Sequence, residues 1–259
     1  MDKKNHQTTS RILNILELLA QNNITGMKFS EISRELEMPK GSLHPLLQTL
    51  VARKYVKFNS GNEKYYLGES LFHLGTKYIQ KSSLLDQIRK IMTDLSESNN
   101  VTSFFGVLSN NQVLYLLREN APGSIQIVAT QGSKVPANCT ALGKSLLSGL
   151  NYVELRELFK DGVPGLTEKS ITNLELLYEQ LQEIGKSGLA YEREESSPYT
   201  RCIATPIICN GKIIAALSAA FPNVDMNEEN LQKLESHLRS AKTEVERIIS
   251  NNFDYWIYS

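Results

Sequence analysis

The sequence predicts an α+β protein in two parts, a small N-terminal domain rich in helices and a larger C-terminal domain built on one antiparallel sheet. Three observations predict this fold class. Apolar residues recur at helical spacing through the first fifty residues, strand-like segments come in pairs separated by turn residues, and a long amphipathic stretch covers residues 228–250. With 259 residues, 41% of them hydrophobic, the chain is long enough for two domains.

The charge of the chain is unevenly distributed, although its formal net value is zero. Residues 1–80 hold 11 Lys and Arg against 7 Asp and Glu, and the remainder holds 17 against 21. A basic small domain on an acidic body is typical of a protein that meets a polyanion. Random scatter of charge explains the asymmetry equally well, so charge alone leaves the question open.

Composition also predicts the compartment. No apolar run approaches the roughly 20 residues of a membrane span, and the first ten residues are too polar for a signal peptide. The three cysteines, Cys139, Cys202 and Cys209, form an odd set in a chain too large to need disulfides. We therefore expect a cytoplasmic protein without membrane contacts.

Three helices are predicted in the first fifty-three residues. Ser10 is the expected N-cap of the first helix, and Ser30 that of a short second helix over residues 31–37. Residues 38–42 form a tight connection to a third helix, which carries leucines at helical spacing. Two short helices joined by such a turn outline a helix-turn-helix.

A β-hairpin is predicted after the third helix, from residues 55–58, a turn at 59–62 and residues 64–67. Three helices followed by a hairpin form a winged helix, whose wing would bring Lys57 and Lys64 to a phosphate backbone. Heads of this kind also serve as protein-docking modules, and the pattern alone leaves that alternative open.

The third helix has the polar, small-residue start expected of a recognition helix entering a major groove. If Ser42 is its N-cap, Pro45 lies in the first turn, where a missing N–H costs little, and the regular helix starts near Leu43. The predicted DNA-binding residues are Lys40, Gly41, Ser42, His44, Pro45, Gln48, Thr49, Arg53, Lys57 and Lys64.

The predicted domains are a winged helix-turn-helix over residues 1–68, a linker helix over 69–82, an effector domain over 83–250 and an aromatic tail over 251–259. The tail either packs on a neighbouring subunit or ends without order. The effector domain is predicted to contain helices at 84–95, 141–150, 153–159, 173–186 and 228–250, and strands at 102–108, 112–118, 124–130, 201–208 and 213–220.

The last predicted helix carries a narrow apolar seam, which either covers the sheet, the ordinary outcome, or contacts another subunit. Residues 71–79 are the better candidate for a dimer contact, because their apolar side chains have no other core to enter. The seam consists of Leu231, Leu234, Leu238, Ala241, Val245 and Ile248.

The sequence gives little support for an enzyme. Residues 143–145 (GKS) look like the end of a phosphate-binding loop, but Asn138 stands where that loop requires glycine. Cys202 has no histidine in a dyad-like context, and no metal-ligand spacing occurs. The run at Glu192, Glu194 and Glu195 is more typical of a solvated loop. We expect no catalytic residues, metal or cofactor; the alternative is a small-molecule enzyme with an accessory winged helix.

Five segments in order resemble the IclR family of transcriptional regulators: 38–44 (MPKGSLH), 140–144 (TALGK), 188–195 (GLAYEREE), 202–206 (CIATP) and 215–218 (AALS). The resemblance implies a GAF-like domain that binds a small organic acid and modulates binding to an operator in double-stranded DNA. It further implies a repressor acting as a homodimer or dimer of dimers. The implied effector-binding residues are Ala141, Leu142, Glu192, Cys202 and Ser218.

The sequence departs from the family pattern at four places. Glu192 replaces a frequent Asp, and Ala220 replaces the second serine of some members, which implies a larger or less polar ligand. Glu37 replaces the usual turn glycine, and Pro45 replaces a frequent arginine. The last change predicts a sequence preference unlike that of the arginine-bearing members. The 143–145 neighbourhood becomes a candidate site for a carboxylate at a helix N-terminus.

Overall fold

The structure is a computed structural model that describes residues 6–80, 83–122, 129–223, 227–253 and 256. The chain divides into two compact units, Met1–Lys81 and Ser82–Ser259, which we treat separately. Within the described ranges, no helix combines the length and apolarity needed to cross a membrane.

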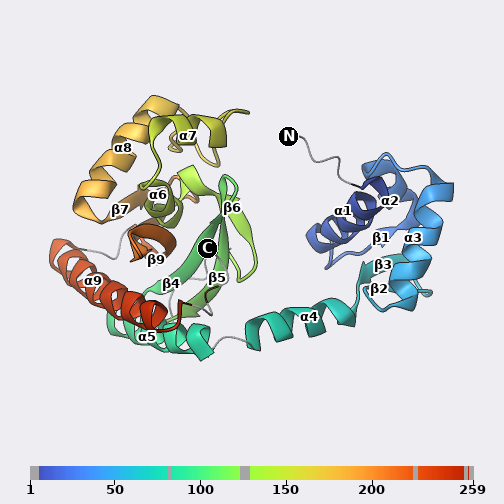
Figure 1. Ribbon diagram of the computed structural model, residues 1–259, viewed down its shortest axis with the longest axis horizontal. Helices are drawn as coiled ribbons and strands as arrows, with labels where there is room; N and C mark the ends of the chain where they lie inside the picture. The colour runs from blue at the N-terminus through green and yellow to red at the C-terminus, as the bar shows by residue number, and fades with distance from the viewer. Residues whose placement is uncertain (1–5, 81–82, 123–128, 224–226, 254–255, 257–259) are drawn as a thin grey trace. The chain divides into compact units, whose positions relative to one another are not determined.

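The N-terminal unit packs helices against a small three-stranded sheet (Figure 1). The sheet has the antiparallel order β1-β3-β2, so β3 is central. Ile15, Leu19, Ile32 and Leu43 are buried together in its core. The elements are α1 (Gln7–Gln21), β1 (Met27–Lys28), α2 (Phe29–Glu35), α3 (Lys40–Ala52), β2 (Val56–Asn59), β3 (Lys64–Leu67) and α4 (Glu69–Gln80).

The three predicted helix starts in this unit are wrong by two to four residues. Helix α1 begins at Gln7 and α2 at Phe29, so Ser10 and Ser30 lie inside helices. Helix α3 begins at Lys40, where the Pro39 carbonyl accepts the Ser42 and Leu43 N–H groups at 2.9 and 3.0 Å. A helix can thus begin from a carbonyl alone, without a capping side chain.

Pro45 consequently lies inside α3 and not at its first turn. A proline at this position leaves the carbonyl of Gly41, four residues earlier, without its helical donor. Gly41 is exposed to solvent, so water can satisfy that carbonyl. The Thr49 hydroxyl also donates a hydrogen bond to the Pro45 carbonyl at 2.8 Å.

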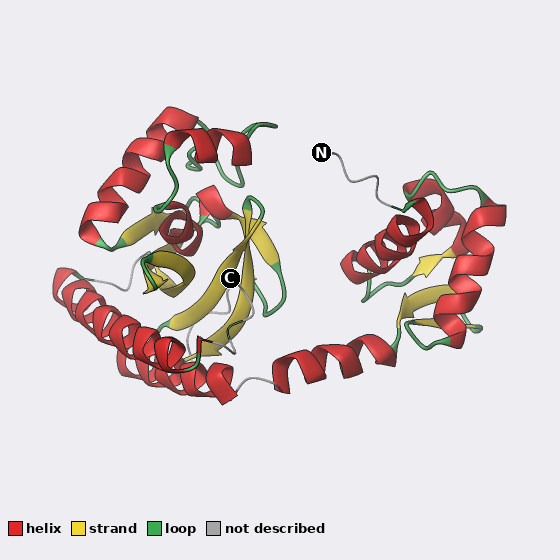
Figure 2. Ribbon diagram, in the orientation of Figure 1, coloured by secondary structure: helices red, strands yellow, loops and turns green. Residues whose placement is uncertain are grey.

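The C-terminal unit is a six-stranded antiparallel sheet of order β6-β5-β4-β9-β8-β7 with helices on both faces (Figure 2). Its helices are α5 (Ser83–Asn99), the 3₁₀ turn η1 (Ala137–Cys139), α6 (Ala141–Leu147), α7 (Tyr152–Leu158), α8 (Leu174–Ser187) and α9 (Glu228–Asn251). Its strands are β4 (Thr102–Ser109), β5 (Gln112–Asn120), β6 (Lys134–Pro136), β7 (Ala190–Arg193), β8 (Thr200–Cys209) and β9 (Lys212–Pro222).

Two strands of this sheet, β6 and β7, do not correspond to predicted strands. The predicted strand at 124–130 falls mostly on residues 123–128, which lie outside the described residues. The other predicted strands and all five predicted helices of the body are present, with ends shifted by four residues or fewer.

The sheet separates two apolar cores. On one face, α5 and α9 lie side by side and pack on residues that include Phe105. On the other face, α6, α7 and α8 pack on residues that include Phe104. Leu234, Leu238 and Val245 of α9 are fully buried in the first core, so the seam of the last helix covers the sheet.

Trp256 belongs to the body's own core. Its side chain is buried, with its ring edge-on to Phe105 at a centroid distance of 6.0 Å. The backbone N–H of Trp256 donates to the Phe253 carbonyl at 2.9 Å. For this part of the tail, neither a neighbouring subunit nor disorder is required.

Candidate DNA-binding surface and ligand cavity

The solvent-facing side of α3 carries most of the residues predicted to contact DNA. Leu43, Leu47 and Leu50 turn inward and are buried. Ser42 is half-buried. The exposed residues of the helix and of the segment after it are Lys40, Gly41, His44, Pro45, Gln48, Thr49 and Arg53. A Cβ placed on Gly41 would meet nothing within 4 Å, so the helix start is open to an approaching molecule.

The two wing lysines differ in their surroundings. Lys57 of β2 is exposed. Lys64 of β3 instead donates from its Nζ to the Thr25 carbonyl at 2.8 Å, which ties the wing to the segment after α1. The two lysines predicted to contact phosphate therefore differ, because the ammonium group of Lys64 already has a structural acceptor and that of Lys57 is exposed.

Glu37 occupies the turn between α2 and α3 with a φ of 46°. This left-handed conformation is costly for a residue with a Cβ. The turn is held by hydrogen bonds from the Met38 N–H to the Ser33 carbonyl at 2.9 Å and from the Ser33 hydroxyl to the Met38 carbonyl at 2.7 Å. The departure from glycine at Glu37 thus falls on a backbone that favours glycine.

The start of α4 is fastened to the end of α3. The Ser70 hydroxyl donates to the Arg53 carbonyl at 2.9 Å, and the Ser70 N–H donates to the Lys54 carbonyl at 3.1 Å. Lys54 and Glu69 form an ion pair at 2.8 Å. The linker helix is therefore attached directly to the recognition helix.

In the C-terminal unit, cross-strand pairing gathers the predicted effector residues on one face of the sheet. Phe104 pairs with Ser218, and Ala220 pairs with Cys202. A bulge between β4 and β5 shifts the register after Phe105. Because a bulge turns the following side chains to the opposite face, Tyr115 joins the same core as Phe104.

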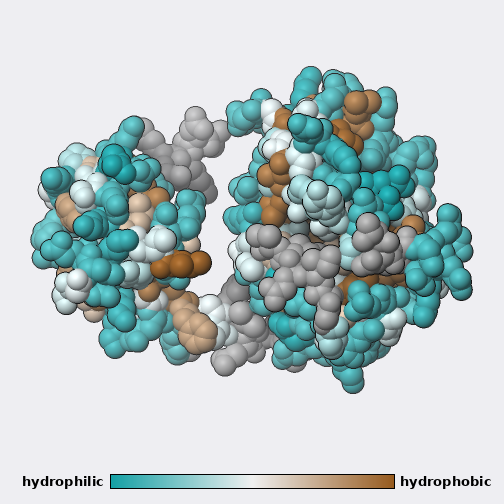
Figure 3. Space-filling view, turned by 180° about the vertical axis from the view of Figure 1, so that it is seen from behind, coloured by the Kyte–Doolittle hydropathy of each residue, from teal (hydrophilic) through white to brown (hydrophobic). Residues whose placement is uncertain are grey.

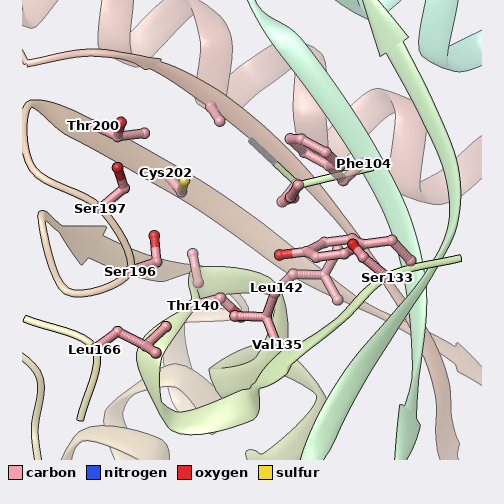
Figure 4. Close-up of a pocket in the computed structure, with 15 residues that line it drawn as sticks. Phe104, Ser133, Val135, Thr140, Leu142, Leu166, Ser196, Ser197, Thr200 and Cys202 are labelled. Atoms are coloured by element: carbon pink, nitrogen blue, oxygen red, sulfur yellow. The ribbon is translucent and has the colours of Figure 1, made fainter. Parts of the chain in front are cut away.

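A cavity of about 290 Å³ lies over this face (Figure 4). Ser196, Ser197 and Thr200 provide hydroxyl groups on one side, and Phe104, Val135 and Leu142 lie on the other. Its fifteen described lining residues include no side chain with a formal charge. Besides those six, they are Tyr115, Ala129, Ser133, Thr140, Ala141, Leu166, Cys202, Ser218 and Ala220.

The first three residues of the segment 140–144 (TALGK) line the cavity. The Thr140 hydroxyl caps α6 by accepting the Gly143 N–H at 2.9 Å. A Cβ on Gly143 would lie 2.1 Å from the Ala137 carbonyl oxygen, so glycine permits the close packing of α6 on η1. Lys144 is fully buried and pairs with Glu195, Nζ to Oε1 at 2.6 Å.

The cavity reaches the start of α6 but not residues 143–145 themselves. Gly143, Lys144 and Ser145 are not among the residues that line the cavity, whereas Thr140, Ala141 and Leu142 are. Lys144, which occupies the place of the lysine in a phosphate-binding loop, is paired with the buried Glu195 carboxylate. The segment's glycine and lysine therefore have structural roles.

Glu192 lies beneath the cavity wall and is not a lining residue, in contrast to the expectation from the resemblance. Its buried carboxylate accepts the Glu195 N–H and, at 3.0 Å, the Ser196 N–H through Oε1. It thereby holds the loop that presents Ser196 and Ser197. The prediction of a solvated acidic run is also wrong, because Glu192 and Glu195 are both buried.

Burial governs the ionisation of the groups around the cavity. It raises the pKa of the Cys202 thiol well above its ordinary value, and nearby Glu192 raises it further. Desolvation likewise raises the pKa of the Tyr115 hydroxyl. Both groups are protonated near neutral pH, so Cys202 is a neutral wall group and lacks the thiolate that nucleophilic chemistry requires.

Of the five residues implied to bind an effector, the structure brings Ala141, Leu142, Cys202 and Ser218 to the cavity. Sequence reasoning missed its hydroxyl wall. The adjacent serines at 196 and 197 were visible in the sequence, but only the loop held by Glu192 turns them toward Phe104. Tyr115 was not identifiable, because its direction depends on the bulge.

The fold and the two sites together define a class of protein, the DNA-binding transcriptional regulators. Members of this class combine a helix-turn-helix domain with a separate domain that contains a cavity for a small molecule. The family model "IclR helix-turn-helix domain" matches residues 8–60, and "Bacterial transcriptional regulator IclR C-terminal" matches residues 76–247. The chain belongs to the IclR family of transcriptional regulators.

Its relatives are named as regulators. The chain is 29% identical over 250 residues to the HTH-type transcriptional regulator KdgR of Escherichia coli, covering 95% of this chain and 94% of KdgR. It is 27% identical to the regulator BhcR of Paracoccus denitrificans, covering 91% and 84%. These names support a regulator and give no support to the enzyme alternative.

Solved structures share the fold. An IclR transcriptional regulator from Alicyclobacillus acidocaldarius superposes with a TM-score of 0.84 at 21% identity, covering 94% of this chain and 99% of the other. An IclR homologue from Microbacterium hydrocarbonoxydans, solved in complex with 4-hydroxybenzoate, has a TM-score of 0.78 at 22% identity, covering 93% and 98%.

Proposed function

We propose that this chain is a repressor whose operator binding is modulated by a small organic acid held in the cavity of the C-terminal unit. The observation that carries the proposal is the cavity itself, about 290 Å³, with hydroxyl groups facing an aromatic and aliphatic wall. Such a container binds a ligand with one polar end and one apolar body.

A carboxylate fits the polar end. The N–H groups of Ala141 and Leu142 are the first two of α6 and therefore have no acceptor within the helix. Together with the Thr140, Ser196 and Ser218 hydroxyls, they can donate to a carboxylate without a cationic side chain. The 4-hydroxybenzoate complex of the Microbacterium relative supports this class of ligand. The name of a 24% identical Salmonella typhimurium relative, "Acetate operon repressor", supports repression.

A thermal-shift screen of small carboxylic acids tests the effector proposal, because a ligand that binds only the folded state raises the melting temperature. A hit should also change the affinity of the full chain for the DNA upstream of its own gene. If a wide panel of acids leaves both the melting temperature and operator affinity unchanged, the effector proposal fails while DNA binding stands.

For the operator we propose that α3 enters the major groove and that the wing approaches the phosphates. The groups proposed to contact DNA are those exposed on α3, Arg53 after it, and Lys57. Lys64 is retained as a secondary contact, because an ammonium group has three donors and the Thr25 carbonyl engages one.

We further propose that the regulator acts as a homodimer or a dimer of dimers on near-palindromic operators. Phe72 and Leu74 of α4 are 77% and 50% exposed, and apolar side chains surface where the N-terminal unit leads into α4 (Figure 3). A second α4 would cover them.

Leu74→Glu tests this contact. It should abolish operator binding and head pairing while leaving ligand affinity nearly unchanged. Leu176→Glu on α8, a site that is 57% exposed, is the matched control and should retain operator binding. Wild-type operator affinity of Leu74→Glu, measured where the wild type is dimeric, would exclude α4 as the dimer contact.

A further inference from the structure

Behind the hydroxyl wall of the cavity lie two buried carboxylates, Glu192 and Glu195, and one buried cation, Lys144. Glu192 is 1% exposed, Glu195 is 7% exposed, and Lys144 is fully buried. Lys144 pairs with Glu195, Nζ to Oε1 at 2.6 Å. With both carboxylates ionised, this cluster carries a net charge of −1.

The two oxygens of Glu192 are not equivalent. Oε1 accepts the N–H groups of Glu195 and Ser196. Among the described residues Oε2 is buried and accepts no hydrogen bond of ordinary geometry, and the side chain that donates to this carboxylate is the Cys202 thiol, a weak donor. An ionised oxygen without a strong donor is costly in such a place, whereas a proton on Oε2 removes the charge and leaves both bonds to Oε1 intact.

Two contacts connect Glu192 to the lining of the cavity. It pairs across the strands with Cys202, a lining residue, and it binds the N–H of Ser196, another lining residue. The titratable groups that interact with it are Glu195 on the same loop, Cys202 of β8 and Tyr115 of β5, and Lys144 of α6 interacts with Cys202 and Glu195. Of these, only Lys144 is a cation, and Glu195 already neutralises it.

An anion that enters the cavity meets no cationic side chain among the fifteen described lining residues and lies beside this negative cluster. At the opposite wall the cation Arg118 lies behind the lining, 5.8 Å from the Phe104 ring centroid, and donates to the Ala129 carbonyl. Two like charges at such short range, away from bulk water, disfavour each other strongly. Both carboxylates have a buried Oε2 without a hydrogen bond of ordinary geometry, but Glu195 is neutralised by Lys144 and Glu192 has no paired cation among the described residues. The group that can relieve the repulsion is therefore Glu192.

We propose that the cavity selects monoanions over more highly charged ligands, and that a monoanion binds together with one proton, taken from solvent onto Oε2 of Glu192. The proposal rests on the proposed effector function and specifies the ligand's charge. The balance is simple: ionised Glu192, one proton and the monoanion give neutral Glu192 with the monoanion bound. Burial already raises the pKa of Glu192 in the ligand-free protein, which lowers the cost of this uptake.

Calorimetric titration of the full chain with 4-hydroxybenzoate in two buffers of different ionisation enthalpy counts the protons taken up. Above the pKa of Glu192 in the free protein, the wild type should take up a fraction of a proton rising towards one. The affinity should fall about tenfold per pH unit while the uptake is complete. The neutral probe 4-hydroxybenzamide has the same shape and should bind without proton uptake.

Glu192→Gln keeps an oxygen for the Glu195 and Ser196 N–H groups but cannot titrate, so its binding should lose both the uptake and the pH dependence. Glu194→Gln is the matched control, because it removes the same charge from the same loop at a residue that pairs outward with Lys169. It should retain the uptake.

The proton on Glu192 can also be detected without a ligand, from the pH dependence of stability. Glu192 binds its proton more tightly when folded than when unfolded. Wild-type stability should therefore decline as pH rises above the ordinary value of 4.5, until the folded pKa is passed. Glu192→Gln should lack that part of the decline.

The possible failures are distinct. Binding of 4-hydroxybenzoate without proton uptake, or identical pH profiles of stability for wild type and Glu192→Gln, would overturn the proton linkage alone. Tighter binding of the dianion phthalate than of 4-hydroxybenzoate would overturn the charge selection. Failure of every carboxylate to bind at any pH would overturn the effector function and this inference with it.

Discussion

Gly68 lies directly against the backbone of Lys54. A Cβ added at Gly68 would stand 2.1 Å from the Lys54 carbonyl oxygen and 2.7 Å from its carbonyl carbon. The Gly68 N–H meanwhile donates to the Tyr55 carbonyl at 2.8 Å. These contacts join the residue that precedes α4 to the segment that follows α3, and only glycine permits the approach.

Gly68→Ala should therefore destabilise the N-terminal unit. Backbone atoms cannot yield as a flexible side chain can, so we expect a loss of about 1–3 kcal/mol in the free energy of unfolding, measured by urea denaturation. Gly75→Ala is the control: it lies in α4 with nothing within 4 Å of its added Cβ, and it should stabilise the helix by roughly 0.5–1 kcal/mol. Equal effects from the two changes would contradict the close approach.

Lys144→Met should destabilise the C-terminal unit by about 3–5 kcal/mol, because it leaves the buried Glu195 carboxylate without its cation. The double variant Lys144→Met, Glu195→Leu should recover most of that loss, since it removes both charges. Lys186→Met breaks only an exposed pair with Glu183 and should have little effect. A double variant as unstable as the single one would show that the pair's charges are not the cause.

Lys57→Ala should weaken binding to all DNA sequences and lower the slope of log affinity against log salt by about 0.9, the value for one lost phosphate contact. His44→Ala and Gln48→Ala should instead change the sequence preference, because these exposed side chains lie on α3. Binding titrations at several salt concentrations, on the operator and on scrambled DNA, separate the two outcomes. Uniform losses from all three changes would mean that α3 is not the element that reads sequence.

Ser218→Ala should weaken binding of an acid ligand by roughly 0.5–1.5 kcal/mol, the net value of one neutral hydrogen bond. Ser240→Ala, on the outer face of α9, provides the comparison and should leave the dissociation constant unchanged. Calorimetric titration of both variants gives the difference. An unaffected Ser218→Ala would place the ligand's polar end elsewhere in the cavity.

The succession of helices and most strands was predictable from the sequence, because each depends on a local period of apolar residues. The positions of helix starts were less so. Ser10, Ser30 and Ser42 are good capping residues, yet the helices begin two to four residues earlier, after N-cap residues whose own side chains make no capping hydrogen bond. β7 escaped prediction because its alternation covers only four residues, Ala190–Arg193.

Only those residues of the candidate site that belong to family-like motifs could be predicted from the sequence. The resemblance led to Ala141, Leu142, Cys202 and Ser218, all of which line the cavity. It misplaced Glu192, because the direction of a side chain depends on partners elsewhere in the fold. The pairing of Lys144 with Glu195 joins residues 51 positions apart, and nothing in the local pattern of either segment indicates it.

The fastening of α4 to the end of α3 makes the linker a lever. Its 12 residues span about 18 Å, so a tilt of roughly 10° about its far end would carry its first turn sideways by about 3 Å. That distance is close to the rise of one base pair, about 3.4 Å. Because the Ser70 and Lys54 contacts move the recognition helix along with the linker, a small angular change in the proposed dimer would shift each recognition helix by about one base-pair step along the DNA.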